Sequence, residues 1–147
     1  MKARNFNQGF STIEYLASAF VDMELHAIED QSALNVDAFE RGTLDRLGMP
    51  REIVMRHRIP HFLHIMGGYA AGYYAYIWSE VLDADSVEWF KQNGGLTRKN
   101  GDHFRDTLLS RGGSEDAVTL FKSFSGREPY VEPLLVRRGL VTQPAPK

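Results

Sequence analysis

Tyrosines are concentrated in one short segment of this 147-residue chain. Four of the six tyrosines lie at residues 69–76, and Tyr69, Tyr73 and Tyr76 are spaced at i, i+4 and i+7. This spacing places three side chains on one face of an α-helix. A phenol can donate a hydrogen bond to a carbonyl oxygen that gains negative charge. The spacing therefore predicts a row of donors, although half-buried core tyrosines would show the same pattern.

Small residues surround these tyrosines. Alanines and a glycine separate them, at positions Ala70, Ala71, Gly72 and Ala75. They would leave the surface open to the backbone of an approaching substrate. Gly67 and Gly68 directly precede the tyrosines and give the chain backbone freedom there.

The histidines near this segment do not form a convincing metal site. His57, His61 and His64 form the pattern H-x3-H-x2-H, and two of them could reach one metal on a helix. Pro60 interrupts that helix, and no carboxylate lies in the register that would complete a site. We therefore expect no metal ligands in this chain. It also has no H-E-x-x-H motif, no nucleophile elbow and no phosphate-binding glycine loop.

The remaining charged residues favour structural roles. Glutamates and aspartates such as Glu14 and Glu80 lie where a solvated helix face is expected. Arg111, Arg127 and Arg137 could bind a peptide carboxylate, because arginine pairs well with carboxylates. Structural ion pairs are the expected role for all three arginines.

Hydrophobic spacing predicts an all-α protein. The expected helices cover residues 11–29, 36–47, 70–92 with a break allowed at 83–85, 100–110, 114–125 and 134–138. The first has Ser11 or Thr12 as N-cap and an apolar stripe that includes Ile13 and Phe20. Gly48 is expected to stop the second helix, and Ser114 and Gly126 are expected to cap and close the fifth. Residues 51–68 are expected to be loop with short turns. The length is typical of one domain with one core.

Composition excludes several classes of partner. The chain has 17 Lys+Arg against 19 Asp+Glu, for a net charge of -2, so it lacks the basic field that attracts nucleic acid or anionic lipid. We find no signal peptide and no apolar run long enough for a membrane span. The absence of cysteine fits a reducing compartment, which predicts a cytoplasmic location. Residues 141–147 have the composition of a disordered tail.

Several long segments resemble one known family. Residues 6–17 (FNQGFSTIEYLA) and 67–82 (GGYAAGYYAYIWSEVL) are similar to the C-terminal region of the thimet-oligopeptidase-like zinc metallopeptidases, and residues 109–114 and 124–129 resemble its late motifs. Residues 94–101 and 138–140 look more like bacterial peptidyl-dipeptidase (dipeptidyl carboxypeptidase). The resemblance implies an all-α, clamshell-like catalytic domain. In the family, an H-E-x-x-H helix and a later glutamate hold zinc, upstream of the matched region.

The resemblance also implies roles for the tyrosine segment. His64, Tyr73 and Tyr76 match positions that contact substrate and stabilise the tetrahedral intermediate. Tyr69 matches a substrate-contacting tyrosine, and Gly67 and Gly68 match a flexible part of the substrate-binding loop. The implied substrate is an oligopeptide that loses its C-terminal dipeptide.

The sequence therefore leaves two hypotheses. In the first, residues 1–140 are the C-terminal part of a peptidase catalytic domain that lacks the H-E-x-x-H region and is inactive alone. Zinc would then be held by residues outside this chain, and exposed apolar helix faces would favour self-association. In the second, the chain is a stand-alone, non-catalytic α-helical module that binds peptides or other partners.

Overall fold

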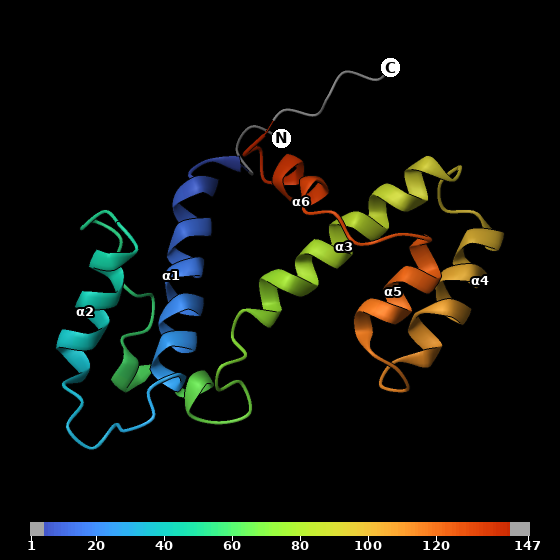
Figure 1. Cartoon of the computed structure of the whole chain (residues 1–147). Coiled ribbons are helices and arrows are strands. Elements are labelled where there is room, and N and C mark those ends of the chain that lie inside the picture. Colours follow the sequence, from blue (N-terminus) through green and yellow to red (C-terminus); the bar gives the residue numbers. More distant parts are fainter. Residues whose placement is uncertain (1–4, 142–147) are drawn as a thin grey trace. The chain divides into compact units, whose positions relative to one another are not determined.

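The computed structural model describes residues 5–141, which form α-helices and short 3-10 helices without any β-strand (Figure 1). The predicted all-α class is confirmed. The chain divides into two compact units, Met1–Tyr76 and Ile77–Lys147, which are described separately below. Each unit has its own cluster of buried apolar residues, so the single core expected from the length is not found.

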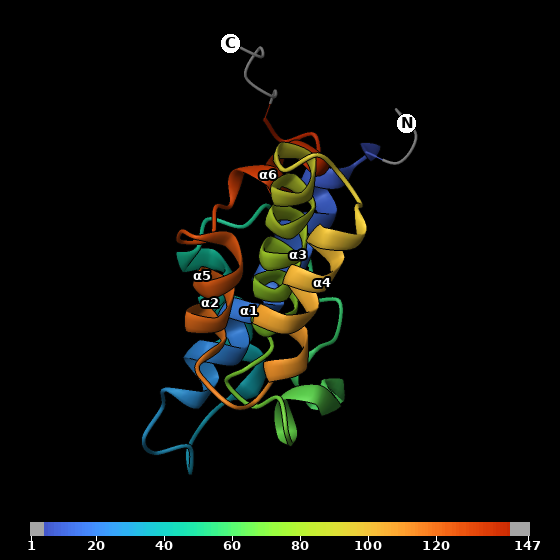
Figure 2. The same ribbon diagram turned by 90° about the vertical axis from the view of Figure 1, so that its right-hand side faces the viewer.

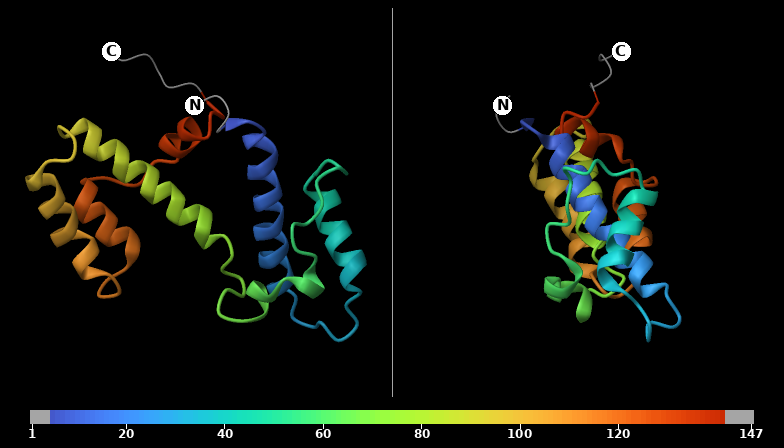
Figure 3. Two further views of the ribbon diagram at one scale, coloured as in Figure 1. Left: turned by 180° about the vertical axis from the view of Figure 1, so that it is seen from behind. Right: turned by 90° about the vertical axis from the view of Figure 1, so that its left-hand side faces the viewer.

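The first unit contains two neighbouring helices. Helix α1 covers Gln8–His26, and α2 covers Val36–Arg46 and returns alongside it (Figure 3). The prediction that Ser11 or Thr12 caps α1 is wrong, because the helix begins after Asn7, which adopts a left-handed conformation with φ of 54°. The Thr12 hydroxyl instead donates to the carbonyl of Gln8 within the first turn.

The core of the first unit lies beneath one side of α1. Ala17, Val21 and Leu25 follow each other at intervals of four residues and are buried. They pack with Met55, Ile59, Phe62 and Ile65. Ile59 and Ile65 belong to two short 3-10 helices, η2 (Ile59–His61) and η3 (Leu63–Met66), and Phe62 is the residue between these helices. The predicted loop with short turns is confirmed.

The other side of α1 is exposed. Phe10, Ile13 and Phe20 are 46%, 37% and 45% exposed, although Ile13 and Phe20 belonged to the apolar stripe predicted to face the core. Only part of that stripe is buried, because an α-helix with apolar residues around most of its circumference can pack one face against a single neighbouring layer.

Helix α2 begins and ends as its sequence predicts. The Asn35 side chain accepts a hydrogen bond of 2.9 Å from the Ala38 amide, as an N-cap should. After the helix, Gly48 has φ of 67°, a conformation that glycine adopts without steric cost.

Helix α3 covers Ala75–Gln92, so it starts later than the predicted residue 70. It continues without a break through residues 83–85, because Ala84 is buried in the core and Asp85 has partners in the fold. Gly94 and Gly95 follow with positive φ values, which confirms the predicted end of this helix.

Two further helices of the second unit, α4 (Arg98–Thr107) and α5 (Ala117–Ser125), lie side by side (Figure 2). The short 3-10 helix η4 (Leu109–Arg111) follows α4. Asp116, and not the predicted Ser114, caps α5 by accepting a hydrogen bond from the Thr119 amide. Ser114 lies too far from the first residue of the helix, Ala117, to be its N-cap, and its hydroxyl donates to the carbonyl of Arg111.

A buried ion pair connects segments of the second unit. Asp85 has no exposed surface, and its two carboxylate oxygens accept hydrogen bonds of 2.6 and 2.7 Å from Arg127. One of these oxygens also accepts a hydrogen bond of 2.9 Å from the Tyr130 amide. The hydrogen bond to Asp85 raises the pKa of Arg127.

Helix α6 (Glu132–Arg137) follows, and Arg137 pairs with Glu80 and Asp83. The structural roles predicted for Arg127 and Arg137 are confirmed, and Arg111 likewise pairs with Glu115.

Two predictions concern features at the limits of the fold. The tail predicted at residues 141–147 lies outside the described residues, apart from Val141. Within residues 5–141, no helix combines the length and the apolar character that crossing a membrane requires.

Candidate functional site

The predicted tyrosine segment is mainly a loop. Residues 67–74, called here the tyrosine loop, lie between η3 and α3 and form successive turns closed by hydrogen bonds such as the one from the Ala70 amide to the Gly67 carbonyl. Ala71 has φ of 54° and interrupts any helix at that point. The prediction that Tyr69, Tyr73 and Tyr76 share a helix face is therefore wrong, since only Tyr76 lies in α3.

A buried carboxylate from α1 holds the tyrosine loop. Asp22 has no exposed surface, and its oxygens accept hydrogen bonds of 3.0 Å from the Ala71 amide and 2.9 Å from the Tyr73 amide. The ring of His26 lies one helical turn further along α1, with Nδ1 at 2.8 Å from the backbone carbonyl of Asp22 and at 3.0 Å from its carboxylate. A helix that began at residue 70 would leave the Ala71 amide without a partner inside the helix and would bond the Tyr73 amide to the Tyr69 carbonyl. The Tyr73 amide bonds to Asp22 instead, and the positive φ of Ala71 excludes a helix through this point, so α3 starts later.

Tyr73 is attached to the core on two further sides. The hydroxyl of Tyr15, on α1, donates to the Tyr73 carbonyl, and the two rings stack at 5.2 Å. The ring of the buried Phe62 meets Tyr73 edge-on at 4.7 Å. Tyr73 is thus half-buried against the first core, as the packing alternative for the tyrosines predicts.

The loop nevertheless gathers the predicted site residues. We call His64, Tyr69, Tyr73 and Tyr76 the aromatic cluster. The His64 ring lies 5.4, 5.9 and 6.1 Å from the rings of Tyr69, Tyr73 and Tyr76. Tyr69 and Tyr76 stack at 5.3 Å, and Tyr73 meets Tyr76 at 5.4 Å and 67°. Each of the four side chains predicted to act together therefore lies beside at least two of the others.

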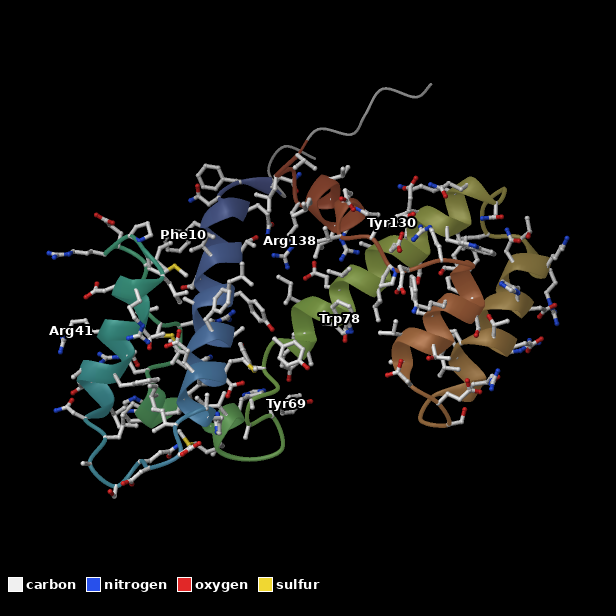
Figure 4. All side chains as sticks on the ribbon, viewed as in Figure 1. Phe10, Arg41, Tyr69, Trp78, Tyr130 and Arg138 are labelled. Carbon is white, nitrogen blue, oxygen red and sulfur yellow. The ribbon has the colours of Figure 1, made fainter. Side chains whose placement is uncertain are left out.

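Much of the aromatic cluster faces solvent. Tyr69 and Tyr76 are 45% and 43% exposed, and His64 is exposed as well. Tyr69 projects from the tyrosine loop in Figure 4. Simple core packing accounts for Tyr73 but leaves the other two tyrosines unexplained, because large aromatic rings gain stability from being buried.

The surroundings of Tyr76 raise its pKa. A hydrogen bond with the Tyr69 side chain is the largest cause, and desolvation and the neighbouring Tyr69 and Tyr73 hydroxyls act in the same direction. A tyrosine is already a protonated phenol at neutral pH, and this shift extends the protonated, hydrogen-bond-donating form to higher pH.

The two glycines of the loop stand in open space. A Cβ atom added to Gly67 or Gly68 would meet no atom within 4 Å, and both residues are exposed. Neither has a positive φ angle. The structure therefore requires neither glycine sterically, and their role in loop movement stays a prediction.

The histidines do not gather around a metal position. Among residues 5–141, no group of three or more His, Asp or Glu side chains could hold a metal ion. His64 belongs to the aromatic cluster, and the ring of His57 packs 5.5 Å from Phe62. The residues that the structure describes thus do not fit a zinc ion, whose ligands the family resemblance places outside this chain.

Sequence reasoning missed Asp22 and Tyr15, both on α1. Asp22 lies next to Val21 and three residues before Leu25, within the stripe that is buried. A carboxylate in that register was the available signal, because a buried carboxylate needs hydrogen-bond donors from elsewhere in the fold. The donors themselves are 49 and 51 residues away in the sequence, where no local pattern reveals them.

Comparison with known proteins identifies the family. The model for Peptidase family M3 matches residues 1–140. The chain is similar to dipeptidyl carboxypeptidase of Salmonella typhimurium, at 45% identity over 95% of this chain and 21% of that protein, and to its Escherichia coli counterpart, at 44% over the same shares. Oligopeptidase A of Escherichia coli is 38% identical, again over 95% and 21%.

The chain spans about a fifth of the length of the curated relatives it matches. Within that span the similarity is continuous, from α1 through the aromatic cluster to α6. Because the family model covers nearly the whole chain, the chain belongs to Peptidase family M3.

Proposed function

We propose that this chain is the C-terminal part of a zinc-dependent peptidyl-dipeptidase, which releases C-terminal dipeptides from oligopeptides, and that it supplies substrate contacts through the aromatic cluster. The proposal rests on family membership, on the similarity to two dipeptidyl carboxypeptidases, and on the exposed rings of Tyr69 and Tyr76 beside His64. A cytoplasmic location is part of the same proposal and is supported by the absence of cysteine.

The chemistry of the cluster suits a peptide carbonyl. Tyr76 is a protonated phenol at neutral pH, so its hydroxyl can donate to a carbonyl oxygen that becomes negative as a tetrahedral intermediate forms. Tyr69 and His64 offer further hydrogen-bonding groups beside it. In a complete enzyme, loss of one such donor is expected to cost roughly a hundredfold or more in turnover.

The chain by itself is expected to bind without cutting. Peptidase family M3 is zinc-dependent in general, and the described residues do not fit a metal ion. Metal ligands and a general base would have to come from polypeptide outside this chain. The exposed face of α1, with Phe10, Ile13 and Phe20, suits packing against such polypeptide or against another copy of this chain.

Binding can be tested by titrating the purified chain with an oligopeptide while recording NMR spectra of the tyrosine rings. We expect the resonances of Tyr69 and Tyr76 to shift, and Tyr76→Phe to weaken binding about five- to tenfold, because one hydrogen bond contributes roughly 1 kcal/mol. The matched control is Tyr130→Phe, which removes an exposed hydroxyl in the second unit. An equal loss in both variants, or no shift in the cluster, would contradict the proposal.

The same titration separates the two hypotheses about the chain. Peptide binding without dipeptide release, by a chain that self-associates through its exposed apolar face, supports a part of a larger catalytic domain. A monodisperse monomer that binds peptide favours the stand-alone module, which the exposed aromatic cluster also suits. Release of C-terminal dipeptides by the chain alone would contradict both.

A further inference from the structure

Asp22 has a role that the aromatic cluster itself does not explain. It is fully buried, yet no lysine or arginine of the described residues pairs with it. Its partners are the amides of Ala71 and Tyr73 and the ring of His26. A buried carboxylate is costly unless donors satisfy it, so these contacts are required for Asp22 to occupy this position.

The bonds from Asp22 stabilise a loop conformation that is unfavourable by itself. Ala71 has φ of 54°, in the left-handed region that residues other than glycine rarely adopt because of the steric cost of the Cβ atom. The two amides that bond to Asp22 provide the interactions that offset this cost. One of those amides belongs to Ala71 itself.

This conformation decides where the tyrosine rings lie. Tyr69 precedes Ala71 by two residues and Tyr73 follows it by two, so a change of φ at Ala71 would move the two rings relative to each other. In the observed conformation, Tyr69 stacks on Tyr76 at 5.3 Å and Tyr73 meets Tyr76 at 5.4 Å. Tyr76 belongs to α3 and does not depend on the loop for its backbone conformation.

We propose that Asp22 is the positioning residue of the aromatic cluster: its buried carboxylate holds the tyrosine loop in the conformation that brings Tyr69 and Tyr73 to His64 and Tyr76. Asp22 does not touch a substrate. Its importance for peptide binding rests on the function proposed above, whereas its effect on the loop does not. The interaction also limits movement, because the half of the loop after Gly67 and Gly68 is attached to α1.

The test compares Asp22→Ala and Asp22→Asn with the original chain. Hydrogen exchange measures the amides of Ala71 and Tyr73, and NMR contacts between ring protons measure the stacking of Tyr69 on Tyr76. In the original chain we expect both amides to be protected. In Asp22→Ala both amides should exchange at least about tenfold faster and the ring contacts should disappear. Asparagine keeps one acceptor oxygen, so Asp22→Asn should restore part of the protection and part of the ring contacts.

A merely structural role would give a different pattern. General destabilisation of the first unit would accelerate exchange equally in the α1 amides of Val21 and Leu25, whereas the proposal predicts that these change by less than about twofold. Ring contacts that persist in Asp22→Ala, or an absence of amide protection in the original chain, would overturn the proposal. So would an Asn variant that behaves like the Ala variant in every measurement.

Substitutions in the loop provide a test that leaves α1 unchanged, in case the Asp22 variants do not fold. Ala71→Pro removes one amide donor and excludes a positive φ, so the ring contacts should disappear. Ala71→Gly keeps the amide and accepts this φ, so they should persist. Ring contacts that survive in Ala71→Pro would overturn the proposal.

Peptide titration of the same variants separates the two proposals. If the original chain binds no peptide but Asp22→Ala loses its ring contacts, the positioning role stands and the proposed function fails. If the original chain binds peptide and Asp22→Ala binds equally well with its ring contacts intact, the positioning role fails and the proposed function stands.

Discussion

Each unit of the molecule contains an aspartate with no exposed surface, and the two are satisfied in opposite ways. Asp85 pairs with the guanidinium of Arg127 and also accepts the Tyr130 amide. Asp22 has the two loop amides and His26. The first carboxylate is neutralised by a side chain of opposite charge, whereas the second depends on backbone dipoles and one histidine.

One group of aromatic rings in each unit shows a related contrast. In the second unit Phe121 and Phe124 are buried, and Trp89 packs 4.5 Å from Phe124. In the first unit Phe62 is buried, but the rings of Tyr69 and Tyr76 in the aromatic cluster remain exposed. The difference teaches that a buried carboxylate can serve either to join structural segments or to hold a loop whose side chains stay available to a ligand.

The largest expected effect comes from removing the charge partner of Asp85. Arg127→Ala leaves a buried carboxylate without its counter-ion, and we expect it to lower the free energy of unfolding of the second unit by roughly 3 kcal/mol. This is the lower end of the usual range, because the Arg127 side chain is 24% exposed. Urea denaturation followed by tryptophan fluorescence reports on this unit, since both tryptophans belong to it.

Arg127→Lys is the matched control for that experiment. Lysine keeps the charge but cannot bind both carboxylate oxygens in the same geometry, so an intermediate loss is expected. A loss below about 1 kcal/mol in Arg127→Ala would show that Asp85, like Asp22, is satisfied mainly by other donors.

A smaller loss of stability is expected when His26, the side-chain partner of Asp22 in the first unit, is replaced by alanine. His26→Ala leaves both amide bonds to Asp22 in place and removes a partly exposed ring, so we expect the free energy of unfolding to fall by less than about 1 kcal/mol. Hydrogen exchange of the α1 amides measures this change, and His61→Ala, at an exposed position, is the control. A loss as large as that of Arg127→Ala would remove the contrast between the two aspartates.

The smallest expected effect is a change in the pKa of Tyr76 within the aromatic cluster. The hydrogen bond with Tyr69 raises the pKa of Tyr76, so Tyr69→Phe should lower that pKa toward the ordinary value of about 10. Because the pKa is raised in the folded state, its contribution to stability is present below the ordinary value and is lost as the pH rises through the folded value.

Titration of the ring carbon of Tyr76 by NMR measures this shift. Tyr74→Phe is the control, because Tyr74 is 48% exposed and lies outside the aromatic cluster. An unchanged Tyr76 titration in Tyr69→Phe would mean that desolvation, and not the hydrogen bond, raises the pKa of Tyr76.

Local sequence signals predicted much of the helical framework. Helix α2 begins after Asn35 and is followed by Gly48, and Gly126 closes α5 with φ of 77°, all as expected. These features depend on the chemistry of one or two residues and their immediate neighbours, so the sequence carries them directly. The Ser114 cap failed because two residues with capping side chains, Ser114 and Asp116, lie close together and only the fold selects between them.

The sequence by itself determined that this protein is all-α, that it resembles the zinc oligopeptidases, and which four aromatic side chains belong together. The arrangement of these four side chains in space depends on the tertiary structure. Helical spacing predicted a straight row of tyrosines. In the structure the segment is a loop, and the amides of Ala71 and Tyr73 donate hydrogen bonds to Asp22. The physical reason is that a buried carboxylate must find its donors, and these lie about fifty residues away in the sequence, beyond the reach of any local pattern.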